Sequence, residues 1–275
     1  VYLETGNMDA SVQLEYMSAD FAISRFAHDA LGDRELSEEY MKRTRFWKRL
    51  YNPEVKWIQS RNANGSWKPL SQGFREATYK DFFWMVPYDI DGLIQIIGGR
   101  DSAEVRLAEY FRRLDADYHE DWYASGNEPC FGFPWLYNWL GQPWKTQEVI
   151  KRVLKEIYLD VSDGLPGNDD LGAMGAWYVW VSLGLYPEIP GVAGFALSTP
   201  SFPYIRIHLP NGKEIVSEST QDGKPYITSM RLDGKPVNGT WIPWEQLSEG
   251  AYLKYNTSDK PNSKWGTRVA PPSYK

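Results

Sequence analysis

The sequence contains very few of the residues that build disulfide bonds and metal centres. Its 275 residues include one cysteine, Cys130, and three histidines. One cysteine excludes a disulfide within the chain, and so few cysteines and histidines argue against a structural zinc site. Cys130 lies in Pro129-Cys130-Phe131 without an obvious histidine partner nearby. This context favours a small, buried apolar role over that of a nucleophile.

The sequence also lacks an excess of positive charge and any long apolar run. Its 30 basic and 36 acidic residues give a net charge of −6 at pH 7, whereas a nucleic-acid partner requires a basic surface. No run of about 18 apolar residues occurs, so no membrane span is predicted. No signal peptide is visible, and the chain begins at Val1 in what reads as mid-domain sequence. We therefore expect a fragment or one chain of a cleaved protein.

Aromatic residues, in contrast, are abundant. The chain has 13 tryptophans and 18 tyrosines. Aromatic rings stack on the C–H faces of sugars, so this composition fits a carbohydrate site. It fits equally well a core that is built from large side chains.

The apolar periodicity divides the chain into two parts. Helical patterns occupy most of residues 1–190, and Gly32 and Pro53 mark the ends of the first two helices. Seven helices are predicted at about 10–32, 36–51, 90–98, 102–115, 133–140, 143–159 and 170–186. We expect residues 1–190 to form a helical domain and residues 191–275 a subdomain of antiparallel strands.

The evidence for strands is an alternating pattern followed by turn dipeptides. Residues 202–208 alternate as in a strand. Four dipeptides that favour hairpin turns follow: Asn211-Gly212, Asp222-Gly223, Asp233-Gly234 and Asn238-Gly239.

Residues 163–187 form the most informative segment. A turn rich in glycine and proline brings Asp169 and Asp170 to the start of an apolar, aromatic helix. The free N–H groups and the dipole at a helix N-terminus favour negative charge, so an ionised carboxylate there suits a general base. The same position suits a helix cap, a common role for aspartate. The segment by itself leaves both interpretations open.

Several other segments, read together with this one, point to a known family. They are Leu14-Glu-Tyr16, residues 19–23, residues 76–93, Gly126-Asn-Glu-Pro129, Leu136-Tyr-Asn138 and Gly141-Gln-Pro-Trp-Lys-Thr-Gln147. Their order and spacing resemble the catalytic half of glycoside hydrolase family 92, the calcium-dependent exo-α-mannosidases. The resemblance covers nearly the whole chain.

The resemblance implies a mainly α fold: part of an (α/α)₆ barrel followed by a small antiparallel β subdomain. Residues 1–190 would be the helical catalytic domain. Members of the family combine an N-terminal β-sandwich with a complete barrel, and seven helices are about half of twelve. An N-terminal β-sandwich and the other barrel half are therefore expected outside this chain.

The resemblance also implies an acid and a base. Glu76 falls on the family's general-acid glutamate, and the apolar run that follows it suggests aromatic surroundings that would keep it protonated. Its alternative is an ordinary loop glutamate paired with Arg75 or Lys80. Asp170 falls on the base. Asn168 stands where the family commonly has a second acidic residue, and it would assist by orienting water.

Further positions correspond to sugar contacts. Asn127 and Glu128 fall on the pair that contacts the released sugar, where well-known α-1,2-specific members have His-Glu, so another linkage is plausible. Trp84 and Asp89 are weaker substrate-binding candidates, and core packing is the stronger alternative for Trp84. Trp177 and Tyr178 are candidates of the same kind. The calcium ligands cannot be identified from the sequence, because no EF-hand-like loop occurs.

Together these observations predict an exo-acting, inverting, Ca²⁺-dependent α-mannosidase that removes terminal α-mannosides from glycans, as in N-glycan degradation. A secreted or periplasmic location is implied by the resemblance alone. Two alternatives remain. The chain could be a truncated, non-catalytic carbohydrate-binding fragment, or an (α/α)₆ glycosidase that acts on a different sugar.

Overall fold

The computed structural model describes residues 9–220 and 223–274, which form two compact units. The first unit contains residues 9–130, 189–192 and 273–274, and the second contains residues 131–188 and 193–272 where they are described. This division follows packing, whereas the predicted domains follow the change of secondary structure near residue 190. Of the described residues, 38% are helix and 18% are strand, so the fold is mixed, with helices first and β-sheets later.

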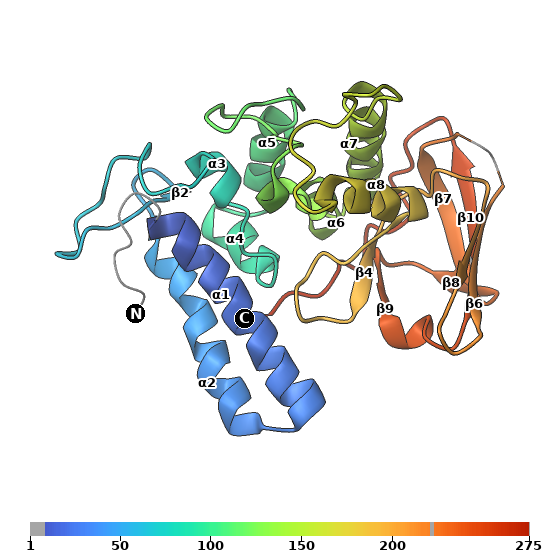
Figure 1. Ribbon diagram of the computed structural model, residues 1–275, viewed down its shortest axis with the longest axis horizontal. Helices are drawn as coiled ribbons and strands as arrows, with labels where there is room; N and C mark the ends of the chain where they lie inside the picture. The colour runs from blue at the N-terminus through green and yellow to red at the C-terminus, as the bar shows by residue number, and fades with distance from the viewer. Residues whose placement is uncertain (1–8, 221–222, 275) are drawn as a thin grey trace. The chain divides into compact units, whose positions relative to one another are not determined.

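The first unit is mainly helical, with one short hairpin (Figure 1). Its elements are α1 (Asp9–Phe26), η2 (Ala27–Leu31), α2 (Arg34–Thr44), η3 (Arg45–Arg49), β1 (Tyr51–Asn52), β2 (Trp57–Ile58), α3 (Tyr79–Phe82), α4 (Ile90–Ile96), α5 (Arg100–Tyr110) and η4 (Glu128–Cys130).

Helices α1 and α2 form a hairpin whose ends follow from the local sequence. Gly32 adopts φ of 67°, which a residue with a side chain rarely adopts, and it ends the first helix as predicted. The carboxylate of Asp33 then caps α2 by accepting a hydrogen bond from the Leu36 N–H at 3.0 Å. The predicted second helix is shorter than expected, because it tightens into the 3₁₀ turn η3 after Thr44. The Ser24 hydroxyl donates to the Ser37 carbonyl and joins the two helices.

The second unit has a helical part and a β part. The helical elements are η5 (Phe133–Trp135), α6 (Leu136–Trp139), α7 (Pro143–Glu156) and α8 (Ala173–Leu183). The β part contains β3 (Leu185–Tyr186), β4 (Gly194–Leu197), β5 (Tyr204–His208), β6 (Glu214–Ser219), β7 (Tyr226–Leu232), β8 (Lys235–Val237), β9 (Trp241–Pro243), the 3₁₀ turn η6 (Trp244–Gln246) and β10 (Ala251–Ser258).

The strands of the second unit form two sheets. One sheet has the order β5-β6-β10-β7-β8 and the other β3-β4-β9. All neighbours are antiparallel except β6 and β10, which run parallel. The prediction of an entirely antiparallel subdomain is therefore wrong at this pair. Apolar side chains of these strands form one core, which includes Ile215, Ile227, Met230 and Leu253.

Two of the four predicted hairpin turns are confirmed. Asn211-Gly212 joins the antiparallel pair β5 and β6. Asp233 and Gly234 join β7 and β8 with φ of 48° and 78°, as a two-residue type I′ turn requires.

The other two turn dipeptides do not form hairpins. Residue 222 lies outside the described residues, and β6 and β7 on either side of it are separated by β10. Asn238-Gly239 connects β8 to β9, which belong to different sheets. A turn dipeptide predicts a local change in the direction of the chain, but it does not specify which strands pair.

No helix formed by residues 9–220 and 223–274 combines the length and the apolar character that crossing a bilayer requires.

Candidate functional site

In the first unit, the loop of residues 73–78, here called the acid loop, carries Glu76. The loop is fixed at its beginning by the N-terminus of α1. The Gly73 carbonyl accepts hydrogen bonds from the N–H groups of Ala10 and Ser11 at 3.0 and 3.2 Å. These are donors that the first turn of a helix cannot satisfy by itself. Gly73 has φ of 87°, and a Cβ there would lie 1.8 Å from the Ser60 hydroxyl, so only glycine fits.

The other end of the acid loop is fixed by a capping box. The Thr78 hydroxyl accepts from the Lys80 N–H at 3.2 Å, and the Asp81 carboxylate accepts from the Thr78 N–H at 2.7 Å. These bonds begin α3 directly after the loop. Glu76 thus lies on a short segment that is held at both ends.

Glu76 itself has a left-handed backbone with φ of 49°. This region is sparsely populated by residues with side chains and is found where surrounding structure enforces it. The side-chain amide of Asn127 donates to the carbonyl of this residue at 2.8 Å and holds the loop from a second segment. The hydrogen bond joins two segments that lie 51 residues apart, and both were predicted as site segments.

The side chain of Glu76 is 53% exposed and forms an ion pair with Arg75 at 2.8 Å. The rings of Phe74 and Phe82 pack against each other, with centroids 5.9 Å apart. About half of the Glu76 side chain is thus open to solvent, whereas the sequence predicted aromatic surroundings that would keep it protonated. The ion pair with Arg75 agrees with the alternative interpretation, that of an ordinary loop glutamate paired with a neighbouring basic residue.

Asn127 and Glu128 have different environments. Asn127 is buried, with 5% of its surface exposed, because its amide is used to hold the acid loop. Glu128 is exposed at the start of the 3₁₀ turn η4. The pair therefore combines one residue that positions Glu76 with one carboxylate that faces solvent.

A buried polar cluster lies behind these two segments. The carboxylate of Asp81 accepts a hydrogen bond from the Tyr110 hydroxyl at 2.5 Å and lies 3.7 Å from the Cys130 Sγ. Burial raises the pKa of Asp81, although the hydrogen bonds from Tyr110 and Thr78 oppose this shift. Burial also raises the pKa of the Cys130 thiol well above its ordinary value, and the neighbouring Asp81 adds to the shift. Cys130 therefore stays a thiol and has a structural role, as its sequence context predicts.

The weaker candidates Trp84 and Asp89 are both buried in the first unit, with 2% of their surface exposed. Trp84 packs edge to face against Phe83, with ring centroids 4.9 Å apart. Asp89 caps α4 by accepting from the Gly92 N–H at 3.0 Å, and the Trp47 indole N–H donates to its other oxygen at 3.3 Å. Both side chains already have packing roles.

A cavity of about 470 Å³ adjoins the acid loop. Its lining includes Ala77, Thr78 and Tyr79 at the end of that loop, together with His119 and Asp121. Asp121 forms an ion pair with Lys80 at 3.0 Å. His119 and Asp121 were not predicted from the sequence as site residues. The only signal that could have indicated His119 is the scarcity of histidine in the chain.

In the second unit, the loop before α8 carries Asn168, Asp169 and Asp170. Asp170, Leu171 and Gly172 have consecutive positive φ angles of 36°, 64° and 89°. Asn168 and Asp170 are exposed, and Leu171 is fully exposed. A run of left-handed residues delays the start of α8 to Ala173, three residues after the predicted start.

Asp169 holds this loop on the helix. One oxygen of its carboxylate accepts hydrogen bonds from the N–H groups of Met174 and Gly175, both at 3.0 Å. Asp169 therefore acts as a cap, one of the two roles that the sequence leaves open for this pair of aspartates. Of the two neighbouring aspartates, Asp169 accepts the hydrogen bonds from the helix, and the carboxylate of Asp170 is not part of the cap.

Replacing Asp169 with alanine is expected to destabilise the second unit by about 1 kcal/mol, the typical cost of losing a helix cap. Chemical denaturation measured by circular dichroism would test this, with Asp160→Ala as the matched control at an exposed position nearby. Equal free energies of unfolding for the two variants would contradict the assigned cap.

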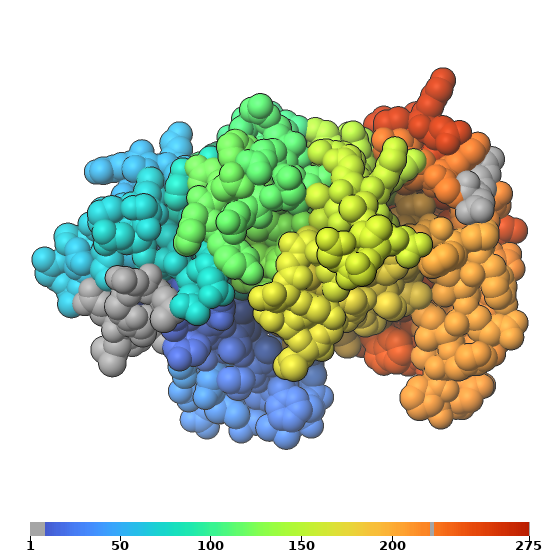
Figure 2. All heavy atoms as spheres, turned by 45° about the horizontal axis from the view of Figure 1, so that its top comes forward, coloured from blue at the N-terminus to red at the C-terminus, as the bar shows by residue number. Residues whose placement is uncertain are grey.

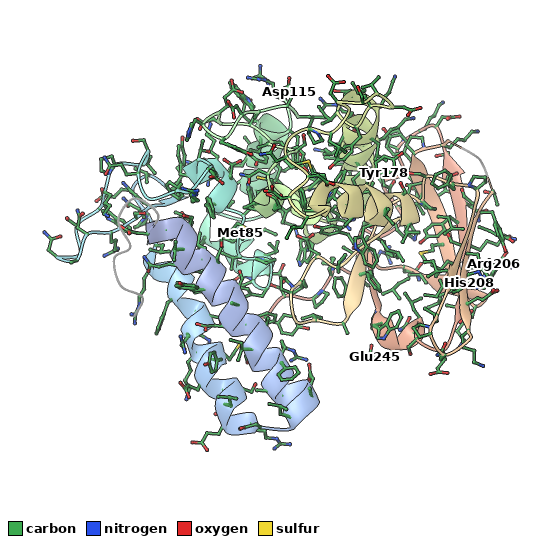
Figure 3. The ribbon with its side chains drawn as sticks, in the orientation of Figure 1. Met85, Asp115, Tyr178, Arg206, His208 and Glu245 are labelled. Atoms are coloured by element: carbon green, nitrogen blue, oxygen red, sulfur yellow. The ribbon has the colours of Figure 1, made fainter. Side chains whose placement is uncertain are left out.

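The aromatic residues of α8 divide between core and surface. Trp177 is buried, stacks on Tyr158 with centroids 5.1 Å apart, and donates its indole N–H to the Phe131 carbonyl at 2.9 Å. Tyr178 is 42% exposed (Figure 3). Of this pair, Tyr178 is the side chain accessible to a sugar.

Comparison with known proteins identifies the family. The model of the glycosyl hydrolase family 92 catalytic domain matches residues 2–259. The chain belongs to glycoside hydrolase family 92. An uncharacterized secreted glycosidase of Arthroderma benhamiae is 29% identical to it over 99% of this chain and 39% of that protein.

Solved structures of two other family 92 proteins superpose on most of this chain. A family GH92 α-mannosidase from Bacteroides thetaiotaomicron is 29% identical, with a TM-score of 0.88, over 94% of this chain and 36% of that one. A family GH92 inverting mannosidase from the same organism is also 29% identical, with a TM-score of 0.87, over 96% and 39% of the two chains. The family 92 chain therefore spans less than two fifths of the length of these relatives.

Family 92 enzymes are calcium-dependent. Among residues 9–220 and 223–274 of the family 92 chain, no three His, Cys, Asp or Glu side chains lie grouped as a metal site requires. The described residues thus do not provide a carboxylate cage of the kind that Ca²⁺ commonly uses.

Proposed function

We propose that this chain is the acid- and base-bearing part of an exo-acting α-mannosidase, which hydrolyses terminal α-mannosides of glycans with inversion. The observation that carries the proposal is the hydrogen bond from Asn127 to the Glu76 carbonyl. It links the Gly-Asn-Glu-Pro motif to the loop of the proposed acid within one compact unit. The family membership and the structural likeness to mannosidases support the substrate class.

In this mechanism Glu76 donates its proton to the glycosidic oxygen as the bond to the anomeric carbon breaks. Asp170 removes a proton from the water that attacks the opposite face of the sugar, and Asn168 orients that water. An inverting enzyme separates the two carboxyl groups by about 6.5–9.5 Å to leave room for the water. The left-handed loops at Glu76 and Asp170 present both carboxylates to solvent, where a substrate can reach them.

The four substrate-binding candidates differ in whether their side chains can touch a sugar. Glu128 is exposed beside the acid loop and is positioned to accept hydrogen bonds from sugar hydroxyls. Asn127 would act mainly through its hold on Glu76. Trp84 and Asp89 would support the site from within the core, because their side chains are buried.

We further propose that the rest of the enzyme covers the base-bearing loop. Exposed apolar side chains gather on the segment that leads into α8: Leu159, Val161, Leu165 and Leu171. Such a group is typical of a surface that packs against protein. The relatives are longer than this chain, which supports further parts as the cover, and the resemblance implies that these are an N-terminal β-sandwich and further helices of an (α/α)₆ barrel. We also propose a secreted or periplasmic location, and the name of the secreted relative supports secretion.

A second candidate function is carbohydrate binding without catalysis. The observation that favours it is the exposure of Glu76 and its ion pair with Arg75, since an acid catalyst must be protonated when substrate is bound. A family 92 glycosidase acting on another sugar is the third possibility.

Mannose release from a panel of α-linked mannosides tests these candidates. We expect release that is abolished by EDTA and restored by added Ca²⁺, because the family is calcium-dependent. The preferred linkage would be read from the panel. Binding of mannosides without release would favour the non-catalytic candidate, and release of another sugar from a parallel panel of α-glucosides would contradict the mannosidase assignment.

A further inference from the structure

A second cavity, of about 300 Å³, lies within the second unit. One wall is α7, and the other is formed by the turns at residues 199–201 and 223–225. Figure 2 shows this hollow between the yellow-green side chains of α7 and the orange side chains of the β part. None of the proposed catalytic or mannoside-binding residues lines it.

The cavity is positively charged. Lys151, Lys155 and Lys224 line it, and no acidic residue is part of its lining. Lys224 forms an ion pair with the exposed Asp259 at 3.1 Å. Lys151 and Lys155 have no ion-pair partner within residues 9–220 and 223–274. These two lysines lie four residues apart on one helix, a spacing at which like charges repel. An anion between them would relieve that repulsion.

A fixed hydrogen-bond donor adds to this charge. The Gln147 side chain lines the cavity and is 97% buried. Its oxygen accepts from the Ile227 N–H at 3.1 Å, which fixes the orientation of the amide group. Its Nε2 has no hydrogen-bond partner in the described part of the chain. A buried amide donor without an acceptor is costly, and an anionic oxygen in the cavity would satisfy it.

The rest of the lining is apolar and rigid. Ile150 and Leu154 follow Gln147 at helical spacing on the same face of α7. Pro200 and Pro225 form the opposite wall, and the Thr199 hydroxyl donates to the Pro225 carbonyl at 2.5 Å, which ties the two turns together. No aromatic ring is part of this lining, so the stacking platform that a sugar commonly uses is lacking here.

From this arrangement we propose that the cavity binds an amphipathic organic anion. The anionic head, a carboxylate or phosphate, lies between the lysine ammonium groups and the Gln147 amide. The apolar body lies against Ile150, Leu154 and the two prolines. The site is independent of the proposed glycosidase activity.

Isothermal titration calorimetry on the 275-residue chain tests the proposal, with hexyl phosphate, hexanoate, inorganic phosphate and 1-hexanol as probes. We expect hexyl phosphate to bind about tenfold more tightly than inorganic phosphate, and 1-hexanol to show no saturable binding. The double variant Lys151→Gln/Lys155→Gln should weaken hexyl phosphate binding about tenfold. The matched control is Lys235→Gln/Lys254→Gln, which removes two exposed lysines of the same unit that do not line the cavity.

Leu154→Ala distinguishes the apolar part of the site from the anionic part. It should weaken the binding of hexyl phosphate and leave the affinity for inorganic phosphate unchanged. Circular dichroism would establish that each variant is folded. Equal binding of hexyl phosphate by the two double variants would overturn the proposal, as would the absence of saturable binding by both hexyl phosphate and hexanoate. Equal affinity for inorganic phosphate and hexyl phosphate would mean that the cavity binds an adventitious ion only, and this result would also overturn the proposal. Comparison of hexyl phosphate with hexanoate shows which head the site prefers.

Discussion

The Glu76→Gln variant is expected to lose between about 10²- and 10⁴-fold in kcat/KM on mannosides whose leaving group is a sugar or an alkyl alcohol. Such leaving groups depart as unstable alkoxides unless they are protonated, and glutamine has no proton of suitable acidity to give. On an aryl mannoside with an acidic phenol as leaving group, the loss should be much smaller. The measurement is a comparison of kcat/KM for the two substrates, on an enzyme preparation that releases mannose.

The ratio of the two losses is what identifies Glu76 as the acid. Glu38→Gln is the matched control, since it makes the same chemical change at an exposed position of α2. It should leave both rates unchanged. An equal loss on both substrates for Glu76→Gln would remove this residue from the acid role and would point to a disturbed acid loop.

For Asp170→Asn we expect a comparable loss of about 10²–10⁴-fold, with a different dependence on the substrate. Water must be deprotonated during attack whatever the leaving group is, so the alkyl and aryl mannosides should lose rate to the same degree. Because asparagine keeps the shape and the hydrogen-bonding oxygen of the side chain, the left-handed loop should remain folded. The measurement is kcat on both substrates at saturating concentration.

Asp160→Asn is the control for this second variant, because Asp160 is exposed and precedes the loop. Nearly full activity of Asp170→Asn, or a loss confined to the alkyl mannoside, would contradict its role as base. Asn168→Asp would then be the next variant, since it places a carboxylate two positions earlier on the same exposed loop.

The local parts of the fold were predictable from sequence because short-range chemistry determines them. Gly32 ends the first helix because glycine, lacking a Cβ, adopts positive φ without strain. Asp233-Gly234 makes a two-residue turn because aspartate and glycine both tolerate the positive φ that the turn requires. The pairing of β10 with β6 was not predictable in this way. More than 30 residues separate the two strands, and no local pattern specifies that contact.

The candidate site shows the same limit. A capping role for an aspartate at this position was predictable, because the N–H groups that donate to the Asp169 carboxylate lie only five and six residues ahead in the chain. The contact between Asn127 and Glu76 depends on the packing of two distant segments, and so does the cavity with His119 and Asp121. Phe74 and Phe82, which flank Glu76 in sequence, pack against each other, and nearness along the chain does not specify which face of a loop a ring covers.

The central position of β10 in its sheet bears on how the chain is made in the cell. Strands β5, β6, β7 and β8 leave the ribosome before β10, yet β10 separates β6 from β7. Until residues 251–258 emerge, the two half-sheets present unpaired edges that can bind each other or another nascent chain. Completion of the sheet therefore waits for synthesis of its last strand, and a ribosome that pauses before this point would prolong exposure of those edges to chaperones and to aggregation.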